Sequence, residues 1–119
     1  RFLDLFKKKG YEKIANTFLP LNKNQLISPF KLWDNITILP HCWQDNVSLK
    51  MKLDLPNEKS LPQLMIMDFH PIHIFLNSEN LERYETTRQY HFDFPALNKL
   101  VNNGYGIKNI LVETIEKNS

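Results

Sequence analysis

Three ionisable side chains follow an apolar run in the segment 64-LMIMDFHPIHIFLN-77. Asp68, His70 and His73 come directly after four apolar residues that are typical of a buried strand. An imidazole titrates near neutral pH and can act as a general acid or base, and a neighbouring carboxylate can orient it. The segment predicts a strand that ends at a polar site. A histidine bonded to the backbone at the core edge is the alternative for His70, and a purely structural role is the alternative for His73.

A second apolar run ends in the same way. The strand candidate 36-ITIL-39 is followed by 40-PHCWQDN-46, which again combines a proline, a histidine, an aromatic residue and a carboxylate. In folds with parallel strands, the loops after the strands converge on one opening. We therefore expect Asp45 and His70 to meet at a shared site, with an Asx turn as the alternative role for Asp45.

Other side chains at these two strand ends have two interpretations each. Trp43 would form the flat wall of a sugar subsite or fill the core. Asp68 would orient an imidazole or cap a turn. Cys42 is interpreted as buried and inert rather than as a nucleophile.

A metal site made by this segment alone is a minor alternative. Asp68, His70 and His73 form the pattern D-x-H-x-x-H, and these donors suit zinc or iron. The spacing matches no known zinc signature and lacks the i, i+4 pair of a helical site, so no metal ligand is assigned within the chain.

The elements that must position these groups follow from local patterns. Basic residues followed by Gly10 are typical of the C-terminal end of a helix, so a first helix is expected to end there. In residues 47-VSLKMKLDL-55, apolar and polar side chains alternate strictly, which favours a half-buried strand over a helix. Further elements are expected as follows: a strand or short helix at 14–19, a loop at 56–62, a strand at 63–69, and helices at 78–90, 95–106 and 107–118. Strands that alternate with helices predict an α/β fold with parallel pairing.

The composition of the chain limits the classes of protein to which it can belong. The chain has 119 residues, of which 42% are hydrophobic, enough for one modest core. The net charge is only +2, and the longest basic cluster is 7-KKK-9, so a nucleic-acid partner is not expected. The single cysteine suits a reducing compartment and hence the cytoplasm, and no apolar stretch approaches the ~20 residues of a membrane span. Residues 1–10 look like the end of a longer helix, so we expect either a single domain over 1–119 or a C-terminal fragment.

Three stretches together resemble a known family. They are 38-ILPHCWQDN-46, 68-DFHPIHIFLN-77 and 104-GYGIKNILVETIEKN-118. The chain is similar over residues 36–118 to the later part of a polysaccharide deacetylase, of the branch found in bacterial O-antigen gene clusters. The FHPIH block is the most specific piece.

The resemblance implies a fold and a chemistry. The expected fold is the C-terminal part of a distorted, NodB-like (β/α)7 barrel, in which parallel strands alternate with helices. The family removes acetyl groups from N-acetylated sugars of a surface polysaccharide. A divalent metal, often zinc, and an aspartate base lie in the N-terminal part of such enzymes, and a late histidine protonates the leaving amine.

The resemblance also assigns roles to residues of this chain. His70 matches the late general acid, and Asp45 stands in the place of the carboxylate that follows Trp43. Expected substrate contacts are Trp43, His41, His73 and Asp68.

The chain departs from the family pattern in ways that affect its function. It has no His-x-x-x-His pair and no early aspartate pair, so the metal and the base are expected on an N-terminal portion of the same protein. Leu39 replaces an arginine, and Gln44 and Asn46 replace acidic residues. A non-catalytic carbohydrate-binding or assembly module, with Trp33 and Trp43 as sugar platforms, is the main alternative. A hydrolase that uses Cys42 or a local metal is the third.

Overall fold

The computed structural model describes residues 2–19, 27–33, 35–53, 55 and 65–117. The expected loop at 56–62 and the first part of the strand at 63–69 lie outside these residues. The chain divides into two compact units, which are described separately: unit 1 is Arg1–Gln44 with Leu55–Asp68, and unit 2 is Asp45–Asp54 with Phe69–Ser119.

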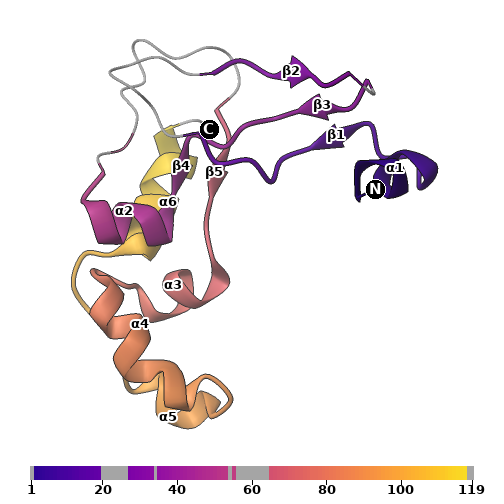
Figure 1. Ribbon diagram of the computed structural model, residues 1–119. Helices are drawn as coiled ribbons and strands as arrows, with labels where there is room; N and C mark the ends of the chain where they lie inside the picture. Colours follow the sequence, from indigo (N-terminus) through magenta and orange to yellow (C-terminus); the bar gives the residue numbers. More distant parts are fainter. Residues whose placement is uncertain (1, 20–26, 34, 54, 56–64, 118–119) are drawn as a thin grey trace. The chain divides into compact units, whose positions relative to one another are not determined.

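Unit 1 contains one helix and five short strands among its described residues: α1 (Phe2–Lys8), β1 (Lys13–Ile14), β2 (Phe30–Lys31), β3 (Thr37–Ile38), β4 (Trp43–Gln44) and β5 (Met67–Asp68). The first three strands lie side by side in the order β1-β3-β2, with β3 parallel to β1 and antiparallel to β2 (Figure 1). Strands β4 and β5 form a separate parallel pair.

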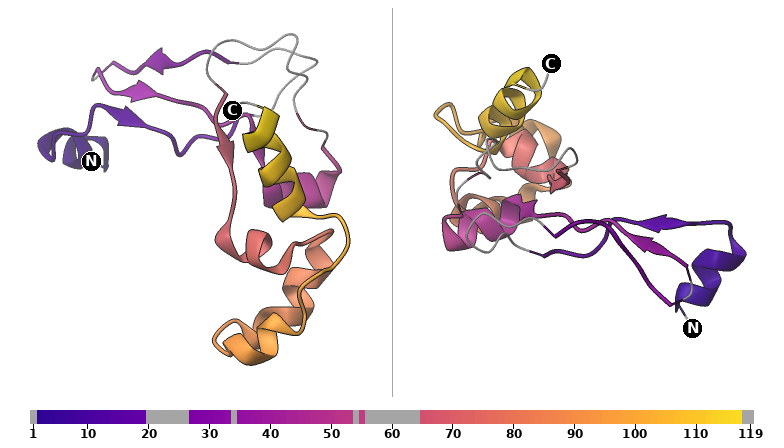
Figure 2. Two further views of the ribbon diagram at one scale, coloured as in Figure 1. Left: turned by 180° about the vertical axis from the view of Figure 1, so that it is seen from behind. Right: turned by 90° about the horizontal axis from the view of Figure 1, so that it is seen from above.

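The core of unit 1 is small and aliphatic. Ile14, Ile36 and Ile38 are buried together, and three partly buried side chains of α1 and the β2 region pack on them: Leu3, Phe6 and Leu32. Figure 2 shows α1 at one end of the three strands. The helix ends as predicted, with lysines in its last turn and Gly10 beyond it at a φ of 79°, a value that suits glycine.

Unit 2 is helical in its described part. It contains α2 (Asp45–Met51), α3 (Pro71–Leu76), α4 (Leu81–Thr87), the 3-10 turn η2 (Arg88–Tyr90), α5 (Phe94–Asn98) and α6 (Ile107–Lys117). Helix α3 contacts both α4 and α6. The predicted helix at 107–118 is confirmed, and the one predicted at 95–106 is shorter than expected. Helix α4 starts later than predicted, because Asn80 rather than Ser78 accepts the capping hydrogen bond, from the Arg83 amide.

Asn77 joins the end of α3 to the loop before α6. Its side-chain amide donates to the carbonyls of Asn102 (3.2 Å) and Gly104 (2.8 Å), and its Oδ1 accepts from the Lys108 amide (3.0 Å). A Cβ placed on Gly106 would lie 2.1 Å from the Asn77 carbonyl oxygen. Only glycine allows this approach, which holds α3 in place.

The strand predicted at 47–55 is wrong. Residues Asp45–Met51 form helix α2, with Asp45 and Ser48 buried at a spacing of three residues. The alternation of apolar and polar residues is real, but both Val47 and Leu49 are only half-buried. The carboxylate of Asp45 in the first turn also favours a helix, because it faces the positive end of the helix dipole.

The chain turns from extended to helical directly after His70. His70 has extended backbone angles, but Pro71 begins helix α3, where its fixed φ is compatible with a first turn. Consequently His70 is the last residue before a helix, and His73 lies one turn further along.

The fold is therefore a mixture of helices and short strands rather than the purely parallel pattern that the sequence predicts. Each of the five described strands has two residues, and β2 is antiparallel to β3. These strands give no evidence for a barrel by themselves. Within the described ranges, no helix combines the length and the apolar character needed to cross a bilayer.

Candidate functional site

Asp45 and His70 form a hydrogen-bonded pair in unit 2. Oδ1 of Asp45 lies 2.6 Å from Nδ1 of the His70 ring, and Oδ2 accepts the backbone N–H of His70 at 2.6 Å. The backbone N–H of Asn46 donates to Oδ1, also at 2.6 Å. Two backbone amides and one ring nitrogen therefore hold the carboxylate, and the carboxylate in turn fixes both the ring and the backbone of His70.

The two partners differ in their exposure. The Asp45 side chain is 0% exposed, whereas the His70 side chain is 39% exposed. Because Nδ1 faces the carboxylate, the second ring nitrogen, Nε2, lies on the far side of the ring from Asp45. A buried carboxylate that orients an imidazole and stabilises its protonated form is the arrangement found in catalytic triads.

The polypeptide brings these residues together through the strands that precede them. Gln44 in β4 pairs in register with Asp68 in β5, and the two strands are parallel. Asp45 comes one residue after the first strand and His70 two residues after the second. The strand predicted at 36–39 is β3, which pairs with β1 and β2 and not with β5. The parallel partner of β5 is β4, which lies in the segment expected to follow that strand as the polar site.

A cavity of about 530 Å³ lies next to His70 within unit 2. Its wall is made by His70 together with residues of three helices: Asn46, Val47 and Lys50 of α2, Ile72 and His73 of α3, and Leu81, Tyr84 and Glu85 of α4. The wall combines apolar side chains with a few polar ones, as small-molecule sites commonly do.

His73 is a buried neighbour of the pair. Its side chain packs edge-on to His70, with ring centroids 6.0 Å apart, and against Tyr84 at 5.3 Å. Its Nδ1 lies 3.1 Å from the hydroxyl of Ser78. Burial lowers the pKa of His73, His70 and His91 lower it further, and only Asp45 opposes them. A neutral, packed His73 matches the structural role left open above, although part of its surface lines the cavity.

Sequence comparison places the chain in a family. A model of the WbmS-like polysaccharide deacetylases matches residues 1–88. The chain belongs to the WbmS-like polysaccharide deacetylases. No curated protein sequence is significantly similar to it.

A solved structure from Bordetella bronchiseptica has the same fold. That protein is described as a polysaccharide deacetylase involved in O-antigen biosynthesis. It superposes with a TM-score of 0.85 at 24% sequence identity, over 98% of this chain and 50% of its own. The WbmS-like chain therefore spans about half the length of that structure.

Other predicted site residues of this family member lie in unit 1. Trp43 is 2% exposed, so its ring belongs to the core and not to an open sugar wall. His41 is also buried, stacked on Phe18 at 5.3 Å, and its Nε2 is 4.0 Å from Asp68 Oδ2. The imidazole next to Asp68 is thus His41 rather than His70.

Cys42 fits the inert interpretation. It is buried, and its thiol lies 3.5 Å from the Ile66 carbonyl oxygen. Burial raises the pKa of the Cys42 thiol, which disfavours the reactive thiolate. A hydrolase based on this cysteine is not supported.

The residues present do not form a metal site. In the described ranges, no group of three histidine, cysteine, aspartate or glutamate side chains is placed to hold an ion. Asp68, His70 and His73 of the D-x-H-x-x-H pattern therefore do not form such a group.

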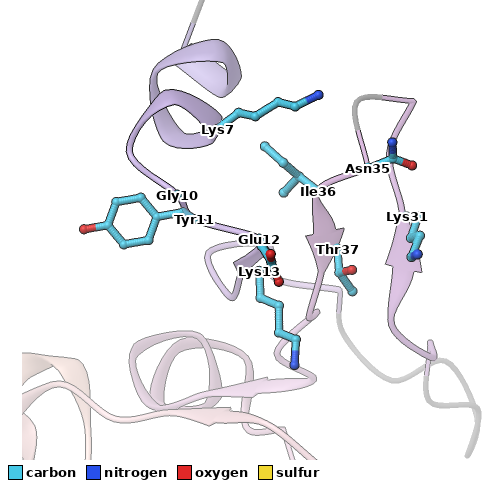
Figure 3. A pocket seen from close by; sticks show the side chains of 9 residues that line it. All are labelled: Lys7, Gly10, Tyr11, Glu12, Lys13, Lys31, Asn35, Ile36 and Thr37. Atoms are coloured by element: carbon cyan, nitrogen blue, oxygen red, sulfur yellow. The ribbon is translucent and has the colours of Figure 1, made fainter.

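A second hollow, of about 450 Å³, lies in unit 1 and includes three lysines in its wall. Figure 3 shows that Lys7 and Lys13 point in different directions, so their ammonium groups do not converge on one point. It also lacks a histidine or a cysteine. The cavity beside His70 is therefore the better candidate site.

Sequence reasoning missed the contribution of α4 to this cavity. Leu81, Tyr84 and Glu85 have the i, i+3, i+4 spacing of one helix face, and that spacing was the available signal. The pattern alone predicts only that the three share a face, and the nearness of that face to His70 depends on the packing of α3 against α4.

Proposed function

We propose that this chain carries the proton-donating part of a polysaccharide N-deacetylase site, with His70 as general acid and Asp45 as the group that orients it. The supporting observation is the 2.6 Å contact between a fully buried carboxylate and a partly exposed imidazole beside a cavity. Family membership supports the reaction class. The substrate in this proposal is an N-acetylated sugar of a bacterial surface polysaccharide.

The chemistry assigned to the pair is the second half of amide hydrolysis. After water adds to the acetamide carbonyl, the bond between carbon and nitrogen breaks, acetate leaves, and the sugar nitrogen needs a proton. His70 in its protonated form donates that proton from Nε2 to the departing amine. Asp45 keeps the ring in its orientation through the contact at Nδ1. Proton donation by a general acid typically contributes about 10²–10⁴-fold in rate.

The metal and the general base are assigned to an N-terminal portion of the same protein. The family resemblance suggests a divalent metal, zinc in particular, and the described part of this chain offers no ligand set for it. The likeness to half of the matched structure supports the view that residues 1–119 correspond to part of a longer protein, and their place in its later part rests on the family resemblance. The expected cytoplasmic location rests on the single cysteine and stays a prediction.

The test uses the full-length natural protein and measures acetate release from an N-acetylated oligosaccharide. His70→Gln should lower kcat by about 10²–10⁴-fold, because glutamine cannot donate a proton to an amine. His91→Gln, a histidine outside the cavity wall, is the matched control and should retain activity. Equal activity of His70→Gln and the natural protein would exclude His70 as the acid.

A carbohydrate-binding role without catalysis remains the second candidate. Trp33 is 75% exposed, which suits a platform for a sugar ring, whereas the other proposed platform, Trp43, is buried. Oligosaccharide binding that Trp33→Ala abolishes, together with no acetate release under any metal supplement, would favour this alternative.

A further inference from the structure

Tyr84 brings an aromatic ring into the wall of the cavity beside His70. It lies on α4, on the helix face that also carries Leu81 and Glu85. Apart from the imidazoles of His70 and His73, its ring is the one aromatic ring among the described residues of that wall. A tyrosine combines a flat apolar ring with one polar group, which suits the carbon side of a sugar ring.

Contacts within unit 2 fix the ring of Tyr84 near the proposed acid. Its centroid is 5.3 Å from that of His73, whose ring in turn lies 6.0 Å from that of His70. The planes of Tyr84 and His73 are tilted by 51° and those of Tyr84 and His91 by 55°, so neither imidazole is stacked in parallel on the phenol ring. A side chain that is already ordered loses little conformational freedom when it binds a ligand.

The side chain of Tyr84 is reachable from water. The residue is half-buried, and among the described residues its hydroxyl is neither hydrogen-bonded nor sealed. Trp43, by contrast, is only 2% exposed. Tyr84 is therefore placed to offer a ligand in the cavity the aromatic surface that the sequence suggested for Trp43.

The rest of the wall limits what that ligand is. Lys50 and Glu85 both line the cavity and carry opposite charges, so the wall has no single sign to attract a strongly charged ligand. Apolar side chains such as Ile72 and Leu81 add to the surface that suits the carbon side of a sugar ring. A volume of about 530 Å³ is in the usual range for small-molecule sites.

We propose that Tyr84 is a specificity-determining residue, whose aromatic ring packs against the ring of the N-acetylated sugar that His70 protonates. This inference rests on the proposed function and adds a residue to its site. It predicts that the phenol ring carries the contact, that its hydroxyl is dispensable, and that the contact is made to the bound sugar rather than through the acid.

The experiment compares two substitutions of Tyr84 in the full-length natural protein. Acetate release is measured on the methyl glycosides of N-acetylglucosamine, N-acetylgalactosamine and N-acetylmannosamine, and the best of the three substrates is used for all variants. Tyr84→Leu should lose about tenfold in kcat/KM through a higher KM, because the contact exists before and during the reaction. Tyr84→Phe keeps the ring and should stay within about twofold of the natural protein.

A tyrosine outside the wall gives the matched control. Tyr105 is 58% exposed, and Tyr105→Leu should behave like the natural protein. An unchanged kcat/KM in Tyr84→Leu would overturn the inference and leave the proposed function intact. Equal losses in Tyr84→Phe and Tyr84→Leu would assign the contact to the hydroxyl, and a loss confined to kcat would mean that Tyr84 acts through the acid; either result overturns the inference.

Fluorine NMR of the natural protein labelled with fluorotyrosine tests the contact even if Tyr84→Leu does not fold. The resonance that is missing from Tyr84→Phe belongs to Tyr84, and it should shift when the best methyl glycoside is added. The resonance that is missing from Tyr105→Phe should not shift. An unmoved Tyr84 resonance, or no binding of any of the three sugars, would overturn the inference. A shifted Tyr84 resonance without acetate release would support the contact and contradict the proposed function.

Discussion

In the part of the chain that the structure describes, each unit contains a histidine close to an aspartate, and the two arrangements are opposite. In unit 1 the histidine is buried and the carboxylate is open: the side chains of His41 and Asp68 are 7% and 42% exposed and lie 4.0 Å apart. In unit 2 the carboxylate is buried and the histidine is open: Asp45 is 0% and His70 39% exposed, at 2.6 Å.

This difference distinguishes the buried ring of His41 from His70, the candidate acid. A carboxylate removed from water interacts more strongly with a protonated ring than an open carboxylate does, because water screens the latter. An open imidazole can also reach a substrate, whereas the buried ring of His41 cannot. The same two residue types therefore give a packed histidine in one unit and a candidate acid in the other.

The largest expected effect tests the two carboxylates against each other. Asp45→Asn in the full-length natural protein should lower kcat for acetate release by about 10²–10⁴-fold, since the imidazolium of His70 loses its counter-charge. Asp68→Asn should lower it far less. Similar losses in both variants, each corrected for the folded fraction, would contradict the contrast between the pairs.

The same contrast predicts a difference in stability. Asp45→Ala should lower the free energy of unfolding by about 3 kcal/mol, because it removes a buried carboxylate and leaves the partly buried amides of Asn46 and His70 without their acceptor. Asp68→Ala should cost less than about 1 kcal/mol, as is usual for an exposed partner of a loose ion pair. Chemical denaturation measures both, and a larger effect for Asp68→Ala would reverse our ranking.

One glycine in each unit allows the tolerance of the two backbones to an added Cβ to be compared. Gly106→Ala in unit 2 forces a Cβ to within 2.1 Å of the Asn77 carbonyl and should cost about 1–3 kcal/mol or more. Gly10→Ala in unit 1 meets no atom within 4 Å, and only its φ of 79° opposes it, at about 1 kcal/mol. Thermal melts of the two variants give the order, and a milder effect at Gly106 would mean that the α3 end is less tightly held.

The smallest effect concerns the pH dependence that His73 adds to unit 2. Burial lowers the pKa of His73 in the folded protein, so the unfolded chain takes up a proton on this residue first as pH falls. Its contribution to stability is therefore complete above the ordinary histidine pKa of about 6.5 and is lost as pH falls below it.

His73→Phe should flatten the fall in unfolding free energy between neutral and mildly acidic pH. The readout is the slope, since the variant also lacks the contact with Ser78 and is less stable at every pH. His91→Phe, a substitution of a less buried ring, is the control for the loss of an imidazole. An unchanged slope in His73→Phe would mean that His73 titrates normally in the folded protein.

Several elements were predictable because their signals are local. The last helix follows from apolar residues at helical spacing, and the end of α1 follows from lysines and Gly10. Strands β3 and β5 lie within the two apolar runs that were predicted as strands, but β4, the partner of β5, was not predicted. The strand predicted at 47–55 fails for the opposite reason. Apolar and polar residues do alternate in this segment, but the surrounding structure decides which side chains are buried. The same sequence can therefore form part of a seven-residue helix, as it does in α2.

For the candidate site, the sequence alone determined which residue types stand at two strand ends and which family they resemble. Only the tertiary structure decided that Asp45, and not Asp68, is the partner of His70, although Asp68 is two residues away in the chain and Asp45 is 25. It also decided that Trp43 is buried and that α4 completes the cavity wall. The physical reason is that local patterns set helix ends and periodicity, whereas a hydrogen bond between distant residues depends on strand register and on which side chain is removed from water.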